Sequence, residues 1–154
     1  MGLDCYMKHG NDHEKAFTSE DDARLKDIKL CGSLFTSGHG SDGSFRGKVY
    51  EPLMDDLMSM SDEDFHGCGI WHKSEDDNPP YVTSDELKAQ ADVLADFIQT
   101  KCDQADEDGV VIGDDDIIYS IGEGYNEYTY KEVWDLLILL RVASERKAVM
   151  HVWW

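Results

Sequence analysis

The sequence predicts a single α+β domain, with a mostly antiparallel sheet of about four or five strands and two principal helices packed on one face. Three observations support this class. Two long segments have helical hydrophobic periodicity and begin with capping sequences. Short segments typical of strands lie between them and at both ends of the chain. Hydrophobic residues make up 41% of the 154 residues, enough for one core over residues 1–154.

The expected strands are short and mostly apolar. Near the N-terminus, Leu3, Cys5 and Met7 alternate with polar neighbours, which is the period of a half-buried strand. The hydrophobic C-terminal segment 148–154 is expected either as a strand of the sheet or as a contact in a homodimer. The other segments expected to form strands are 28–35, 109–112 and 116–121.

The two principal helices begin at Thr83 and Thr129, each followed three residues later by a glutamate that completes a capping box. The second helix is apolar almost all round over 133–143, so we expect it to be central and buried. Shorter helices are predicted after Ser19 and from Pro52, which suits a first helical turn. The apolar stripe of the first helix comprises Leu87, Ala91, Leu94, Ile98 and Cys102.

Residues 36–48 form a Gly/Ser-rich segment that we predict to be a loop. It contains the spacing G-x-G-x-x-G, but no helix follows directly, and Val49 stands where a phosphate-binding loop needs Ser or Thr. No nucleotide cofactor is therefore expected. Arg46 and Lys48 are rare positive charges in this chain, and they are expected either to bind an anion or to pair with nearby acids.

The chain carries 33 acidic and 14 basic side chains, a formal net charge of −19. This charge argues against direct nucleic-acid binding and against adsorption to an anionic membrane, because both need clustered cations. Residues 74–128 hold 16 acids and two lysines, a net charge of −14. A basic protein is therefore the partner that the sequence favours.

The most acidic segment is 103–116, in which seven of fourteen residues are carboxylates. We predict it to be a turn between a helix and a strand. Aligned on Gly109, it places Asp106, Asp108 and Asp115 at ligand positions of a calcium loop, but Gln104 takes the first position. The segment is thus either a calcium site or a solvated acidic turn.

A second group of ligand-type side chains is His66, Cys68 and His72. Zinc accepts such mixed nitrogen and sulfur ligands, and Cys31, His39 or Cys5 can supply a fourth. The spacing matches no known zinc module, so the alternative is a buried cysteine between ordinary loop histidines.

Other reactive groups give weaker patterns. Cys31 followed by His39 resembles part of a cysteine-nucleophile site, but the acidic surroundings oppose a thiolate. Glu123 and Tyr125 lie in a Gly- and Tyr-rich segment that faces a ligand or covers the core. Asp135, inside the most apolar helix, is explained by an i,i+4 pair with Lys131.

Two functional hypotheses follow. The preferred one is a non-enzymatic binding or regulatory protein whose acidic surface meets a basic partner, including by imitation of a nucleic acid. The alternative is a small metal-assisted or anion-binding enzyme whose site is formed by loops 36–48, 66–72 and 122–128. Four scattered cysteines and no apolar leader-like segment predict a reduced protein of the cytoplasm.

Overall fold

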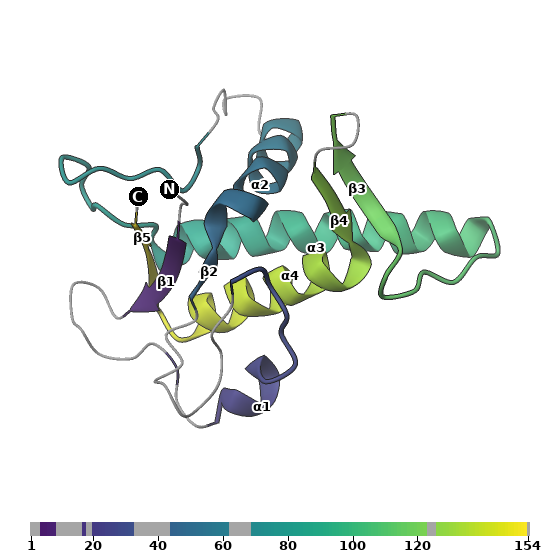
Figure 1. The fold of residues 1–154 in the computed structure, drawn as a ribbon, viewed down its shortest axis with the longest axis horizontal. Helices are drawn as coiled ribbons and strands as arrows, with labels where there is room; N and C mark the ends of the chain where they lie inside the picture. Colours follow the sequence, from purple (N-terminus) through teal and green to yellow (C-terminus); the bar gives the residue numbers. More distant parts are fainter. Residues whose placement is uncertain are drawn as a thin grey trace.

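A computed structural model of the chain describes residues 4–8, 17, 20–32, 44–61, 69–122 and 126–153. Within these ranges the protein forms four helices and five strands, and the predicted α+β class is confirmed (Figure 1). The strands are divided between two small antiparallel sheets rather than joined in one. One sheet has the order β2-β1-β5, and the other is the pair β3-β4.

The first sheet joins the two ends of the chain. Its central strand β1 (Asp4–Lys8) pairs with β5 (Val149–Trp153) on one side and with the short β2 (Phe45–Arg46) on the other. The strands predicted at both ends of the chain are thereby confirmed. On the outer side of β5, Val82 and Met150 exchange two backbone hydrogen bonds of 2.9 Å, so the chain itself covers part of the edge expected to form a homodimer.

The second sheet is a hairpin of β3 (Ile117–Ile121) and β4 (Asn126–Thr129). The Tyr128 side chain is buried, and its hydroxyl donates a 2.7 Å hydrogen bond to the backbone carbonyl of Val49. Burial of this aromatic ring and satisfaction of its hydroxyl hold the hairpin against the rest of the fold.

The two principal helices lie side by side and run in opposite directions (Figure 1). Helix α3 (Ser84–Glu107) begins with the predicted capping box, in which Thr83 and Glu86 satisfy each other's backbone N–H groups. Helix α4 (Tyr130–Glu145) begins with Thr129, whose hydroxyl accepts the Glu132 N–H. The Glu132 carboxylate is bonded by the hydroxyls of Thr129 and Tyr50.

Helix α4 is central and buried, as predicted. It contacts α3, strand β4 of the hairpin and the short helix α1 (Asp22–Leu25), and its side chains supply a large part of the core. Truncating such a leucine costs about 2–5 kcal/mol in folding free energy. The buried apolar residues of this helix are Val133, Leu136, Leu137, Leu139, Leu140, Val142 and Ala143.

The strand predicted over 28–35 is wrong over its described part, residues 28–32. Ile28 and Leu30 are buried, so the apolar pattern of this segment reflects its contact with the core. The backbone donors, however, are satisfied by side chains: Lys29 N–H donates to Asp135 and Cys31 N–H to Tyr50. The short helix α1 (Asp22–Leu25) lies just before this segment.

Helix α2 (Gly47–Ser61) begins five residues before Pro52, so the predicted loop 36–48 is wrong from Phe45 onward. Phe45 and Tyr50 are buried against each other, which draws the end of the Gly-rich segment into regular structure. The rest of that loop, 36–43, lies outside the described residues.

The predicted strand over 109–112 is also wrong, because α3 continues to Glu107 and ends in a helix-terminating turn. Gly109 has φ +70°, and Val110 N–H donates to the Ala105 carbonyl while Gly109 N–H donates to that of Asp106. This pattern is the Schellman motif, which requires a left-handed residue that glycine adopts without strain. The acidic turn is therefore shorter than the predicted range 103–116.

Candidate functional site

The end of α3 projects from the body of the molecule (Figure 1). We call residues 103–116 the acidic tip. All seven of its carboxylate residues are exposed, and the segment contains no lysine or arginine. Three of the seven (Asp103, Asp106 and Glu107) lie near the C-terminal end of α3, where the helix dipole favours cations over anions. The charge of the tip is thus unfavourable for local helix stability.

The acidic tip continues along α3 as a row of carboxylates. At 100° per residue, the five positions that share the outward face lie within about 60° of arc, and at 1.5 Å per residue they extend over about 33 Å. All five residues are exposed. We call this row the carboxylate stripe; its members are Asp85, Asp92, Asp96, Asp103 and Glu107.

The ion pairs of the described residues lie mostly away from the acidic tip. Among the described residues, no ion pair includes a carboxylate of the acidic tip, and the stripe has one weak pair, 3.8 Å between Lys88 and Asp92. Two arginines pair near α1, where Arg24 lies 2.6 Å from Glu145 and Arg146 lies 2.8 Å from Asp21. The negative charge of the acidic tip is therefore not neutralised by ion pairs within the described residues.

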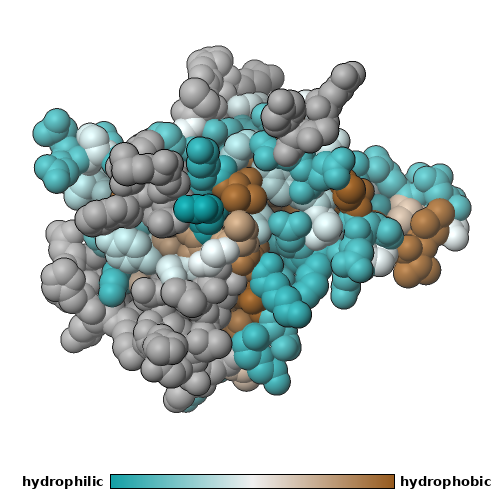
Figure 2. Space-filling model, in the orientation of Figure 1, coloured by the Kyte–Doolittle hydropathy of each residue, from teal (hydrophilic) through white to brown (hydrophobic). Residues whose placement is uncertain are grey.

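Exposed apolar side chains accompany these charges. Val110 is 56% exposed and Val111 is 90% exposed, directly after α3. Ile117, at the start of β3, and Trp134, on α4, are exposed as well. Figure 2 shows hydrophobic residues at the projecting end of the molecule, bordered by hydrophilic ones. Charge and apolar surface together are typical of a site that contacts another macromolecule.

The three carboxylates expected to bind calcium occupy different local structures. Asp106 lies in the last turn of α3, Asp108 caps the helix, and Asp115 follows in a separate turn. Among the described residues, no group of three or more His, Cys, Asp or Glu side chains is arranged to hold a metal ion. The geometry therefore does not bring these three together as ligands.

His72, expected as a zinc ligand, contacts a carboxylate of α2. Its Nε2 lies 2.6 Å from Glu51, whose carboxylate also accepts the Trp71 N–H at 2.9 Å. Burial raises the pKa of Glu51 to about 7, and burial lowers the pKa of His72 below its usual value. Both shifts favour the uncharged forms of the two side chains, so the contact is a hydrogen bond rather than a full ion pair. The other expected ligands, His66 and Cys68, lie outside the described residues.

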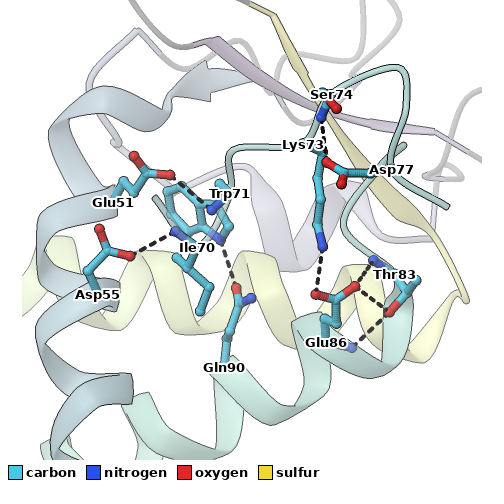
Figure 3. Close-up of polar contacts among 10 residues, drawn as sticks. All are labelled: Glu51, Asp55, Ile70, Trp71, Lys73, Ser74, Asp77, Thr83, Glu86 and Gln90. Atoms are coloured by element: carbon cyan, nitrogen blue, oxygen red, sulfur yellow. Dashed lines mark hydrogen bonds and ion pairs between the residues drawn. The ribbon is translucent and has the colours of Figure 1, made fainter. Parts of the chain in front are cut away.

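Side chains of α2 and α3 bind the loop around Trp71 through hydrogen bonds (Figure 3). The Asp55 carboxylate, one turn after Glu51, accepts the N–H groups of Gly69 and Ile70 at 2.7 and 2.8 Å. The Trp71 indole N–H donates a 2.8 Å hydrogen bond to Gln90 on α3, and both side chains are buried. Sequence reasoning missed Glu51, Asp55 and Gln90, because an acidic pair on a short helix gives no signal of what it faces.

The remaining expected site residues are not brought together by the described structure. Arg46 is exposed at the end of β2, and Lys48 is exposed in the first turn of α2. Cys31 is exposed, and its backbone carbonyl accepts the Arg46 N–H at 2.8 Å. The other three expected residues, His39, Glu123 and Tyr125, lie outside the described residues.

Asp135 has the pairing expected from the sequence. Its side chain is buried, and its carboxylate lies 2.9 and 3.0 Å from the Lys131 ammonium. It also accepts the Lys29 N–H at 3.0 Å. Asp135 is thus a structural residue that joins α4 to the segment at 28–30.

Searches with family models, against curated proteins and against solved structures gave no significant match. In the described part of the chain, no helix combines the length and apolar character needed to cross a bilayer.

Proposed function

We propose that this protein is a non-enzymatic binding or regulatory protein that uses the acidic tip and the carboxylate stripe to bind a basic protein. The observation that carries the proposal is the set of seven exposed tip carboxylates that make no ion pair with the described cations. Charges in this arrangement repel one another, and a basic partner relieves that repulsion on binding.

The position of the charges favours a binding role over a general role in solubility. Carboxylates spread over the whole surface would serve solubility equally well. Here they follow one helix face and gather at its C-terminal end, where they oppose the helix dipole. A local cost to stability is typical of surfaces selected for function. The row of negative charges is also the feature through which imitation of a nucleic-acid strand would operate.

The experiment compares two variants that each lose four negative charges. The stripe variant carries Asp92→Asn, Asp96→Asn, Asp103→Asn and Glu107→Gln. The control variant changes four exposed acids that lie off the stripe and the tip: Asp27→Asn, Glu75→Gln, Asp76→Asn and Glu127→Gln. The probe is a fluorescent arginine-rich peptide, and its binding is measured by anisotropy at low and at physiological salt.

We expect the stripe variant to bind the peptide at least about tenfold more weakly than the wild type, because exposed charge pairs contribute roughly 0.2–1 kcal/mol each. The control variant should lose much less affinity. Equal losses in the two variants would show that the peptide responds only to net charge, and absence of binding by the wild type would contradict the proposal outright.

A further inference from the structure

Trp134 is an unusual side chain on a helix that is otherwise buried. The outward positions of α4 are 134, 138, 141 and 145, and Trp134 is the outward aromatic residue, 41% exposed. Tyr130, one turn earlier, stacks against it with ring centroids 6.3 Å apart and planes inclined by 23°. We call these two stacked rings at the N-terminal end of α4 the aromatic pair.

The aromatic pair adjoins the acidic tip. The backbone N–H groups of Tyr130 and Lys131 donate to the carbonyls of Asp116 and Asp114 at 2.8 and 3.1 Å. The Tyr130 hydroxyl lies 4.0 Å from the Cys102 thiol, next to Asp103 of the carboxylate stripe. Burial raises the pKa of Tyr130, the contact with Cys102 raises it further, and the charge of Asp114 adds the smallest contribution.

Two nearby lysines have contacts of their own. Lys101, next to Cys102, lies over the Phe97 ring with its ammonium 5.7 Å from the ring centroid. Lys131 is held by the Asp135 carboxylate at 2.9 Å, which neutralises its charge. Arg141 lies two turns further along the outward face of α4, away from the tip. The aromatic pair therefore has negative charge on the side of the tip and positive charge at its far end, so it favours a partner whose cations lie over the tip.

We infer that the aromatic pair binds the guanidinium group of an arginine in the basic partner, with Trp134 stacked on its face and the tip carboxylates accepting its N–H groups. The inference rests on the proposed function and names the side chain that the site selects. A guanidinium is planar and weakly hydrated, so it stacks on an indole and bonds to carboxylates at the same time. An ammonium is compact and strongly hydrated, so lysine gains less from this geometry.

The test uses two fluorescent peptides of identical sequence except that every arginine of one is lysine in the other. Each is titrated by anisotropy with the wild type, with Trp134→Leu and with Trp134→Phe, which keeps an aromatic face. Because Trp134 is partly exposed, all three proteins should fold, and circular dichroism verifies this. We expect the wild type to prefer the arginine peptide by at least about threefold. Trp134→Leu should abolish this preference, and Trp134→Phe should keep part of it.

The outcomes separate this inference from the proposed function. If both peptides bind and the stripe variant weakens both, but Trp134→Leu keeps the full arginine preference, the inference is wrong and the proposed function stands. Equal affinity of the wild type for the two peptides also overturns the inference alone. If neither peptide binds the wild type, the proposed function fails and the inference fails with it.

Discussion

The buried carboxylate of Asp135 gives the sharpest stability prediction. Asp135 is 3% exposed, and its carboxylate is bonded by the Lys131 ammonium and by the Lys29 backbone N–H. The perturbation is Asp135→Leu, which places an apolar side chain in the same buried position and removes both carboxylate oxygens that accept hydrogen bonds. Asp135→Asn is the matched control, because its amide oxygen still accepts the Lys29 N–H.

The expected magnitudes follow from which groups lose their partners. In Asp135→Leu the Lys29 N–H is left without an acceptor, which costs about 1–3 kcal/mol. The Lys131 side chain is one-third exposed and turns to water, so we expect a total loss of about 2–4 kcal/mol in unfolding free energy. Asp135→Asn should lose about 1–2 kcal/mol. Lys131→Met leaves the buried carboxylate with one donor fewer and should lose about 2–4 kcal/mol.

The assay is urea unfolding followed by far-ultraviolet circular dichroism on the three single variants and on Asp135→Leu combined with Lys131→Met. The double variant should lose less than the sum of its two single variants by at least about 1 kcal/mol, because the two groups contact each other. If Asp135→Leu is as stable as the wild type, Asp135 does not anchor the segment at 28–30. A buried acid that stability does not need would then itself become a candidate for a functional residue.

Three further predictions concern stability and metal binding. Burial raises the pKa of Glu51 from 4.5 to about 7, so the folded state binds this proton more tightly than the unfolded state does. The unfolding free energy of the wild type should therefore fall by roughly 2–3 kcal/mol relative to that of Glu51→Gln as pH rises from 5 to 8, measured by urea unfolding. A pH-independent difference between the two proteins would contradict this assignment. Trp71→Phe leaves the buried Gln90 oxygen without its donor and should lower the unfolding free energy by about 1–3 kcal/mol. The double variant Trp71→Phe with Gln90→Leu should lose less unfolding free energy than the sum of the losses in the two single variants. Millimolar calcium should leave the melting temperature unchanged, and an increase would show that the acidic tip gathers ligands after all.

The parts of the fold that sequence reasoning found are those with local physical causes. The capping residue Thr83 fixes the start of α3, and the apolar surface of 133–143 fixes α4 as the central helix. The alternation of Cys5 and Met7 identifies β1, since both side chains are fully buried. Each of these signals lies within a few residues of the element that it predicts.

The errors arose where tertiary contacts decide local structure. The segment at 28–30 has a strand-like apolar pattern, but its backbone donor at Lys29 is taken by Asp135, more than 100 residues away in the chain. Helix α2 begins before Pro52, and the hydroxyl of its buried Tyr50 donates to Glu132, 82 residues further along the chain. No pattern confined to either segment contains this information.

The candidate site was found in part. The net charge identified residues 74–128 and the tip, but the carboxylate stripe emerges only when α3 is known to continue to Glu107. In the sequence Trp134 is one residue of an apolar helix, and its exposure depends on which faces of α4 the hairpin and α3 cover. The zinc and calcium hypotheses depended on side chains converging, which spacing alone does not determine.

The central claim is that a basic partner binds at the acidic tip and the carboxylate stripe. The most direct measurement is a titration of the isotope-labelled protein with the arginine-rich peptide, followed residue by residue in amide and indole N–H nuclear magnetic resonance spectra. The account predicts the largest shifts at residues 103–116, along the outward face of α3 and at the Trp134 indole. Shifts scattered over the whole surface, or concentrated near α1 at the opposite end of α4, would contradict it.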